Sequence, residues 1–281
     1  MASNSSVSVV VLTRNPARTI HQCLSSIIDE GPGEIIVVDA MSTAATRDTL
    51  GRFRVEIMED HSRSLGRARQ TGVVHANGKY VMFVDSDVEL TEGCIGTMVA
   101  ELEENGWAAI QARVLSREVT RYWQDPSYLF NVTPNDSHAE PREYVATAAS
   151  LFRRDVLLHA NFDPDFVEAC EDSDVSWRLV REGHLLGIST AVAFHQCHCT
   201  FPTLIGQQIE WGRGYARLAR KHGLLRFVFG PIANPSSNLM RSLATGKWNH
   251  VSYFLSIAAG RLIGAATLRP KQVKTIKLNT A

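Results

Sequence analysis

Short apolar runs alternate with helical segments through the first half of the chain, and this alternation constrains the fold most. The runs with strand character are residues 7–13, 34–40, 55–60, 80–85 and 108–115. Helical patterns lie between them at residues 16–28, 43–52, 65–77 and 91–104. Continuous apolar runs are typical of strands buried on both faces of a parallel sheet. Strands alternating with helices indicate βαβ units with right-handed crossovers. The sequence therefore predicts an α/β fold, a doubly wound and mostly parallel sheet flanked by helices.

Two of the predicted helices begin with residues that are typical of N-caps. We expect Asn15 to cap the first helix, with Pro16 at its first position, and Thr91 to cap the fourth.

Residues 116–143 are polar, aromatic and rich in proline, which is typical of a long functional loop. After it we expect a strand running into a short helix at 145–153, a helix at 171–182, a strand at 185–194 and basic helical sequence from residue 204.

The net charge of zero conceals a division along the chain. Residues 211–281 hold 12 Lys or Arg and no Asp or Glu, which leaves 17 of the 29 basic residues and all 29 acidic residues before them. Such a tail favours an anionic partner: nucleic acid, an anionic membrane surface or the acidic body of the same protein. Residues 251–268 form the longest apolar stretch, but they include Arg261 and two glycines, and a spanning helix needs about 20 apolar residues. We expect an interfacial helix or one packed on the domain, with residues 224–230 beside it.

Cysteine usage and the first residues bear on the cellular compartment. The five cysteines are odd in number and unframed, which favours a reducing compartment. The opening residues, MASNSS, have neither the basic nor the apolar region of a secretory signal. We therefore expect a cytoplasmic protein, held peripherally on the cytoplasmic face of a membrane by its basic tail.

Two carboxylates follow the buried strand at residues 80–85, in the run Asp85-Ser86-Asp87. Alternation along an extended chain places both on the same side. Ligands bind at the carboxyl ends of strands in open α/β sheets, and paired carboxylates suit Mg²⁺ or Mn²⁺ carrying a phosphate. The alternative is a solvated turn, where Asp and Ser are common.

A second acidic cluster, Glu171-Asp172-Ser173-Asp174, opens a helix. The helix macrodipole favours acidic residues in the first turn, which is one sufficient explanation. A carboxylate at such a helix start, near a metal-bound phosphate, can also act as a general base that takes a proton from an attacking hydroxyl.

The ordered motifs VSVVVLTRN, EIIVVDAMST, GRARQTGVVHANGKYVMFVDSD, NFDPDF and CEDSDVSWRLVREG resemble the family 2 glycosyltransferases of GT-A fold. The resemblance covers roughly residues 6–220. It implies a GT-A catalytic domain over residues 1–220, with a nucleotide-sugar half at 6–115 and an acceptor half at 116–220. Residues 221–281 would then be a basic helical segment. It also implies inverting transfer of a sugar from a nucleotide-sugar donor, UDP- or GDP-linked.

The resemblance also assigns metal and base roles. Asp85 and Asp87 match the family's DxD motif, with Asp87 on the metal and Asp85 on the metal or ribose. The family often places a metal or diphosphate ligand at the position of His195. Asp172 matches the family's base, and we place Glu171 beside it on the acceptor side.

On the donor side, Thr13, Asn15 and Asp39 match positions that hold the nucleoside, and Arg69 matches an arginine near the donor phosphates. After Asp39 the family usually has a second acid and then Gly-Ser, whereas this chain has Ala40-Met41-Ser42. That departure leaves the nucleotide base open. The alternative for Arg69 is a surface helix charge, the commoner situation for an arginine.

Residues 207–211, QQIEW, resemble the QxxRW motif of processive synthases, but Glu210 replaces its arginine. Trp211 is a candidate acceptor platform or a core residue, and Arg213 a candidate diphosphate contact. His195 also lies near Cys197, His198 and Cys199, but the spacing does not favour structural zinc.

The apolar, basic tail suggests a lipid-linked acceptor such as a polyprenyl-phosphate carrier, and we expect no nucleic-acid partner. Two alternatives remain open. A nucleotidyltransferase or phosphatase would need a Gly-rich loop or a DxD after the first strand, where this chain has TRNPART. A non-enzymatic polyanion- or membrane-binding protein would leave both acidic clusters unexplained.

Overall fold

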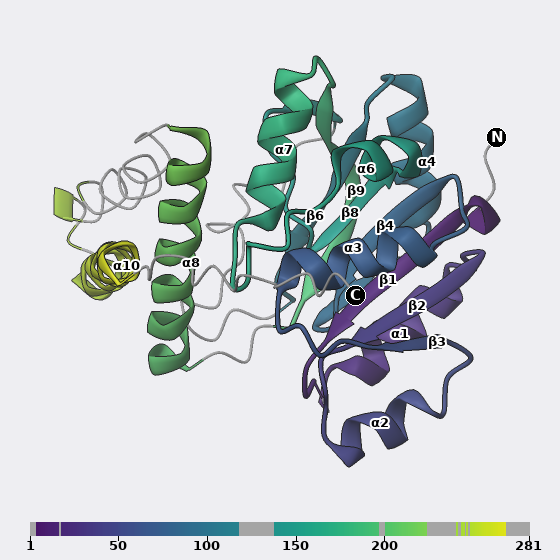
Figure 1. Cartoon of the computed structure of the whole chain (residues 1–281), viewed down its shortest axis with the longest axis horizontal. Helices are drawn as coiled ribbons and strands as arrows, with labels where there is room; N and C mark the ends of the chain where they lie inside the picture. The colour runs from purple at the N-terminus through teal and green to yellow at the C-terminus, as the bar shows by residue number, and fades with distance from the viewer. Residues whose placement is uncertain are drawn as a thin grey trace, which may run out of the picture. The chain divides into compact units, whose positions relative to one another are not determined.

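The computed structural model describes residues 4–16, 18–117, 138–196, 200–223, 240, 243–244, 246 and 248–267. The chain divides into two compact units, Met1–Leu204 and Ile205–Ala281 (Figure 1). The division falls earlier than the boundary at residue 220 that the sequence suggested, so most of helix α8 (Phe201–His222) belongs to the second unit.

The first unit alternates strands and helices as expected. Its strands are β1 (Val7–Thr13), β2 (Glu34–Asp39), β3 (Glu56–Glu59), β4 (Tyr80–Asp85), β5 (Val88–Leu90), β6 (Ala109–Leu115), β7 (Glu140–Arg142), β8 (Ala149–Arg153) and β9 (Leu186–His195). Its helices are the 3-10 turn η1 (Asn4–Ser6), α1 (Ile20–Asp29), α2 (Ala44–Leu50), α3 (Leu65–His75), α4 (Cys94–Glu104), α6 (Arg154–Ala160) and α7 (Glu171–Arg181).

Among the described residues, nine strands form one sheet in the order β3-β2-β1-β4-β8-β6-β9-β5, with β7 paired to β9. The pairs β3-β2, β2-β1 and β1-β4 are parallel. Strand β8 joins antiparallel to both β4 and β6, and β9 returns parallel to β6. The first four strands thus form the predicted parallel sheet, and antiparallel pairs enter with β8.

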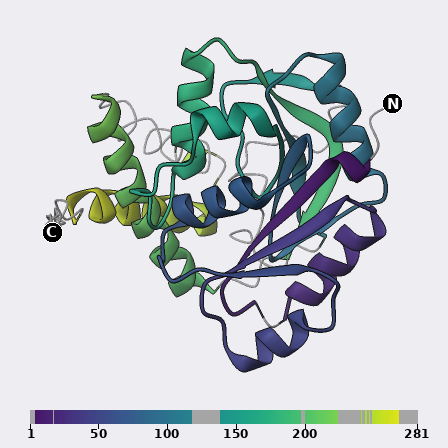
Figure 2. The ribbon, with the colours of Figure 1, turned by 45° about the vertical axis from the view of Figure 1, so that its right-hand side comes forward.

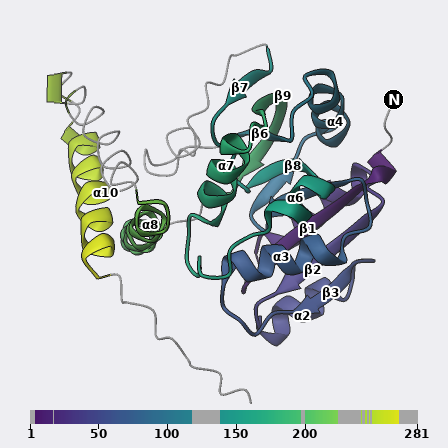
Figure 3. The same ribbon diagram turned by 45° about the horizontal axis from the view of Figure 1, so that its top comes forward.

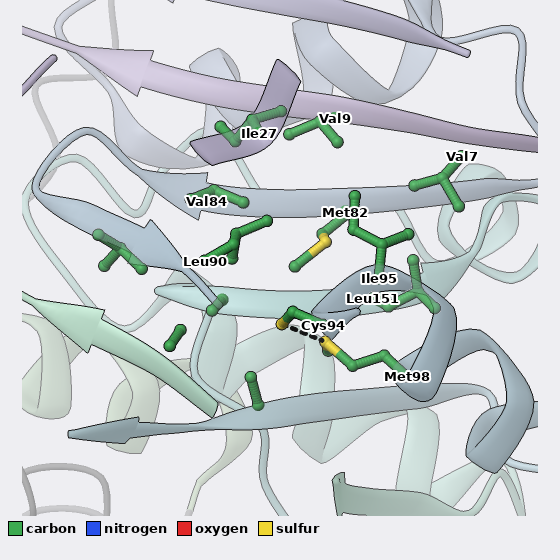
Figure 4. Close-up of a cluster of buried hydrophobic side chains, with 14 of the residues drawn as sticks. Val7, Val9, Ile27, Met82, Val84, Leu90, Cys94, Ile95, Met98 and Leu151 are labelled. Atoms are coloured by element: carbon green, nitrogen blue, oxygen red, sulfur yellow. Dashed lines mark hydrogen bonds between the residues drawn. The ribbon is translucent and has the colours of Figure 1, made fainter. Parts of the chain in front are cut away.

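The two faces of the sheet carry separate cores. Helices cover both faces (Figure 2). Alternation along β1 sends Val7, Val9 and Val11 into one core and Val10 into the other. The first core packs the sheet against α1 and α4, as Figure 4 shows for Ile27, Ile95 and Met98. The second packs it against α3, α6 and α7. Helices on both faces agree with the predicted sheet flanked by helices.

The expected helix cap at Asn15 is wrong. Helix α1 begins at Ile20, after Thr19. Asn15 has a left-handed backbone with φ 58°, and its side chain accepts a hydrogen bond from the backbone N–H of Thr43 at 2.8 Å. Asn15 therefore binds the loop after β2 and does not cap α1.

The expected cap at Thr91 is also wrong. The Thr91 hydroxyl donates to the Val192 carbonyl of β9. Glu30, just beyond α1, caps α4 instead, because its carboxylate accepts the backbone N–H groups of Gly93 and Ile95 at 2.6 and 2.8 Å. Strand β5 lies within the turn that we expected between β4 and α4, and β7 occupies part of the expected loop at 116–143. Residues 118–137 of that loop lie outside the described residues.

The second unit contains α8 and α10 (Trp248–Ala266), which cross one another (Figure 3). The crossing is close because glycines lie at the contact. A Cβ atom at Gly212 would lie 2.1 Å from the Arg261 carbonyl oxygen, and one at Gly264 would lie 2.0 Å from that of Ile209. Within the part of the chain that the structure describes, no helix combines the length and apolarity that crossing a membrane requires. The expected apolar partner at 224–230 lies outside the described residues.

Candidate functional site

Three parallel strands end together at the carboxyl edge of the sheet. The register pairs Thr13 of β1 with Asp39 of β2, and Leu12 of β1 with Asp85 of β4. The structure therefore brings Thr13, Asp39 and Asp85 to one edge, as the sequence predicted, and this is where open α/β sheets bind ligands.

Asp85, Asp87 and His195 come together beyond that edge. The chain turns after Asp85 into β5, which pairs antiparallel with β9 so that Val88 lies opposite His195. The imidazole Nε2 of His195 lies 3.3 Å from Asp87 Oδ2. The Asp85 and Asp87 side chains are 38% and 40% exposed. Both carboxylates are thus held by the sheet and still accessible to a ligand.

Burial raises the pKa of Asp85 to about 6, and the neighbouring Asp87 charge acts in the same direction. The Arg69 guanidinium and His195 oppose this rise. The two negative charges repel one another, so a cation bound between the carboxylates would be stabilised by both.

Arg69 connects the two acidic clusters. It lies on α3 with its side chain 7% exposed, and its Nε donates to Glu171 Oε1 at 2.7 Å. Its Nη2 lies 3.5 Å from Asp85 Oδ1. Although burial opposes it, Glu171 and Asp85 raise the pKa of Arg69. The alternative of an exposed helix charge is therefore wrong for this residue.

The start of α3 is fixed to the loop that precedes α7. Ser64 caps α3 by accepting the Arg67 N–H, and its hydroxyl donates to the Pro164 carbonyl at 2.7 Å. The Gly66 N–H donates to the Phe166 carbonyl at 3.0 Å. A Cβ atom at Gly66 would lie only 2.1 Å from the Asp163 carbonyl oxygen, so this approach requires glycine. The NFDPDF segment thus helps to position Arg69.

Helix α7 begins with the second acidic cluster. Glu171 is 3% exposed and its carboxylate is bound to Arg69. Its contacts make it a residue that holds Arg69, and its expected place on the acceptor side stays a prediction. Asp174 is bound to Arg178 one turn along the same helix at 2.9 Å. Asp172, which is half-buried, is the carboxylate of this helix start that neither ion pair occupies.

The Asp172 carboxylate accepts hydrogen bonds at both of its oxygens, and the Ser173 hydroxyl is one of the donors, to Oδ1 at 3.3 Å. The Ser173 N–H donates to Oδ1 at 2.6 Å, and the Tyr144 hydroxyl donates to Oδ2 at 2.8 Å. Burial raises the pKa of Asp172 to about 6, helped by the charge of Glu171, while Tyr144 and Arg69 lower it. A carboxylate with a pKa near the working pH has the basicity that a general base needs.

The candidate nucleoside residues form a small network. Both Asp39 carboxylate oxygens lie 3.2 Å from the Ser42 N–H, which donates to them. The Asn15 N–H donates to Ser42 Oγ at 2.9 Å. The Thr13 hydroxyl is buried and has no hydrogen-bond partner among the described residues. The sequence AMS, which departs from the family pattern, thus still forms an ordered loop tied to Asn15, with Met41 exposed.

The donor set at the sheet edge is suited to a divalent cation. Mg²⁺ is commonly held by one or two carboxylates together with substrate phosphates, and Asp85 and Asp87 supply two accessible carboxylates. Within the described ranges, no group of three or more His, Cys, Asp and Glu side chains is arranged to hold a metal ion. Cys197, His198 and Cys199 lie outside those ranges.

Trp211 and Arg213 lie on α8, in the second unit. Arg261 of α10 lies 5.8 Å from the Trp211 ring centroid, and Arg213 Nε donates to Thr267 Oγ1 at 3.4 Å. Their expected acceptor and diphosphate roles stay predictions.

Sequence reasoning missed Tyr144. It lies between the loop expected at 116–143 and the strand expected from residue 145, and its contact with Asp172 joins residues that are 28 positions apart. No local pattern marks such a pairing, because the fold alone brings the segment before β8 to the start of α7.

Comparison with known proteins identifies the family. The model of glycosyl transferase family 2 matches residues 8–159, which is more than half of the chain. The chain belongs to glycosyl transferase family 2. The matched residues include β1 from Ser8 on, β2, α3 and the Asp85-Ser86-Asp87 turn, so the family match covers the sheet edge described above.

This family 2 chain is similar to the pre-mycofactocin glycosyltransferase of Mycobacterium tuberculosis, with 24% identity over 280 residues. The alignment covers 94% of this chain and 58% of the relative, so the chain spans little more than half of that relative's length.

Two solved structures share the fold. A mannosyltransferase from Pyrobaculum calidifontis, solved in complex with GDP-Man and Mn²⁺, has a TM-score of 0.64 and 18% identity, covering 93% of this chain and 89% of its own. Residues 1–349 of Staphylococcus aureus TarS have a TM-score of 0.55 and 14% identity, covering 92% and 91%. These likenesses confirm the predicted α/β architecture of GT-A type for this family 2 chain.

Proposed function

We propose that this protein transfers a sugar from a nucleoside-diphosphate sugar to an acceptor hydroxyl, with inversion at the anomeric carbon. The observation that carries the proposal is the Arg69 bridge, which brings the Asp85-Ser86-Asp87 turn and the Glu171-Asp172 helix start into one site. Membership of glycosyl transferase family 2 supports it.

On the donor side, Asp85 and Asp87 would hold Mg²⁺ or Mn²⁺, with His195 beside Asp87. A cation there neutralises the charge that develops on the departing nucleoside diphosphate. Arg69 holds Asp85 in place and adds a fixed positive charge. The buried Thr13 hydroxyl and the Asp39 loop would contact the nucleoside. The Pyrobaculum structure, which contains GDP-Man and Mn²⁺, is consistent with this choice of ligands.

On the acceptor side, Asp172 would take the proton of the attacking hydroxyl. Its accessible carboxylate has a pKa of about 6, so it is ionised at neutral pH and basic enough to assist the attack. A base that activates the acceptor on the face opposite the leaving group produces inversion.

We also propose that the second unit binds an anionic membrane surface, which would favour a lipid-linked acceptor. Helix α10 exposes Trp248, Leu255 and Leu262, which recur every seven residues and are 70%, 53% and 51% exposed. Residues two helical turns apart share a face, so these three form an apolar stripe. The sequence around the stripe is basic, with 12 Lys or Arg and no acid over residues 211–281.

Such a helix is suited to lie in the interface of an anionic leaflet.

A ligand screen followed by a transfer assay tests the enzymatic proposal. Thermal shift would be measured with UDP- and GDP-sugars in Mg²⁺, Mn²⁺ or a chelator. One donor at about 100 times its Kd should stabilise the fold by about 2.7 kcal/mol, and only with a cation. That donor should then release its nucleoside diphosphate on transfer, with an inverted anomeric centre in the product. Absence of stabilisation by every donor, with either cation, would contradict the proposal.

A further inference from the structure

The Tyr144 hydroxyl is the one side-chain group outside α7 that donates a hydrogen bond to Asp172 among the described contacts. It binds Oδ2, whereas Ser173 of the same helix binds Oδ1. The two carboxylate oxygens of Asp172 therefore have different partners, and the Tyr144 hydroxyl fixes where Oδ2 points.

The segment that carries Tyr144 is anchored on both sides of the site. The Val145 N–H donates to the Ser176 hydroxyl of α7 at 3.3 Å, and the Ala146 N–H donates to the Gln111 side chain of β6 at 2.6 Å. Ser176 lies one helical turn after Asp172. The helix that presents the carboxylate thus also fixes the backbone next to the tyrosine.

Core packing does not account for this tyrosine. Tyr144 is 41% exposed, although the residues that follow it, Val145 and Ala146, are buried. An exposed aromatic ring whose hydroxyl points at a half-buried carboxylate contributes little to the core. Its hydroxyl contacts Asp172 at 2.8 Å.

We propose that Tyr144 is a positioning residue for Asp172, whose hydroxyl fixes the orientation of the carboxylate and favours its ionised form. This inference rests on the proposed role of Asp172 as the base. A donor to a carboxylate stabilises the charged state. The charged groups that face Asp172 are Glu171 on its own helix, which opposes ionisation, and Arg69 from α3, which supports it. Tyr144 acts in the same direction as Arg69.

The test compares Tyr144→Phe with the wild-type protein over a range of pH. Activity requires the ionised base, so kcat/KM rises with pH through the pKa of Asp172. Loss of the hydroxyl raises that pKa and moves the rising limb to higher pH. We expect a loss of about fivefold near pH 5.5 that shrinks to about twofold near pH 8, because water replaces part of the lost hydrogen bond.

Tyr80→Phe is the matched control, because it removes the same group at the start of β4, where the hydroxyl contacts Glu103 and not Asp172. Tyr80→Phe should leave the rising limb of the pH profile of kcat/KM in place, even if the variant lowers the Tm. A Tyr144→Phe rate that falls equally at every pH, with an unmoved limb, would overturn the inference.

A second measurement separates this inference from the proposed function. The side-chain carboxyl of Asp172 can be titrated by ¹³C NMR and assigned with Asp172→Asn. Tyr144→Phe should move its titration to higher pH whether or not a donor has been found. An unmoved titration overturns the inference. A moved titration in a protein that transfers no sugar supports the contact and counts only against the proposed function.

Discussion

At the scale of single residues, the site depends on which acidic side chains are already engaged in ion pairs with arginines. Glu171 and Asp174 are bound to Arg69 and Arg178. Asp172 differs because its partners donate hydrogen bonds without carrying full positive charge. The same acidic helix start thus contains two structural carboxylates and one that is chemically available.

Asp172→Asn should therefore abolish most transfer without loss of donor binding. The amide keeps the shape of the side chain but cannot take a proton, and general base catalysis contributes about 10²–10⁴-fold to a rate. The measurement is kcat with saturating donor and acceptor. Donor affinity, measured by thermal shift, should stay within experimental error of the wild type. A variant that transfers at the wild-type rate would refute the base assignment.

Asp87→Ala should remove the part of donor affinity that depends on a cation. Asp87 is accessible and contacts His195, and a Mg²⁺ or Mn²⁺ site built from two carboxylates loses half of its protein ligands. Calorimetry with the donor should show weaker binding in Mn²⁺ and no change in chelator. Asp48→Ala, an exposed aspartate on α2, is the matched control. Unchanged affinity in Mn²⁺ would exclude Asp87 as a ligand.

At the scale of elements, the site is assembled by strand ends and by one loop. The register of β1, β2 and β4 aligns Thr13, Asp39 and Asp85 at the sheet edge. The loop through Asp163 and Phe166 then fixes the start of α3, and with it Arg69.

Gly66→Ala tests whether this loop controls the site. The new Cβ atom would lie 2.1 Å from the Asp163 carbonyl oxygen, so the loop must move. Overpacking costs about 1–3 kcal/mol, which corresponds to a fall in Tm of about 2–12 °C, and transfer should fall as well. Gly96→Ala on α4 is the control, because its Cβ would meet only Asn4 Oδ1, at 3.5 Å. It should keep or raise the Tm by helix propensity. An unchanged Tm for Gly66→Ala would contradict the role of the loop.

The elements also mark the limit of what the sequence predicts. Apolar runs located β1, β2 and β4 to within a residue or so, because buried parallel strands have a distinct local composition. The predicted caps at Asn15 and Thr91 are wrong, because both residues bind distant segments and Glu30, just beyond α1, caps α4.

In the candidate site the motifs located the two acidic clusters and the strand-end residues, because each has a local signature. They did not predict the Arg69 bridge to Glu171 or the contact of Tyr144 with Asp172. Those contacts join residues 102 and 28 positions apart, and only the packed fold brings them together.

At the scale of the whole molecule, charge is divided between the two units. The first contains the acidic site, and the basic sequence from residue 211 lies in the second. Close glycine contacts between α8 and α10 fix one face of α10 and leave Trp248, Leu255 and Leu262 on the exposed face. An apolar stripe within basic sequence is the feature that the membrane proposal depends on.

Flotation with vesicles tests that proposal. The wild-type protein should float with vesicles of phosphatidylcholine and phosphatidylglycerol, and should stay at the bottom with phosphatidylcholine alone. Each basic residue near an anionic surface contributes about 1 kcal/mol, and about 0.5 M NaCl should weaken binding by screening. The double variant Leu255→Asp with Leu262→Asp should not float, because it places two charges in the stripe.

Leu185→Asp is the matched control, because Leu185 is an exposed leucine of the first unit, 59% exposed, and its replacement should leave flotation unchanged. Circular dichroism would establish that the double variant keeps its helices. Flotation of the double variant equal to that of the wild type would mean that the basic residues bind without the α10 stripe. A wild-type protein that stays at the bottom with anionic vesicles at low salt would remove the membrane, and with it the argument for a lipid-linked acceptor, while leaving the sugar-transfer site of the first unit intact.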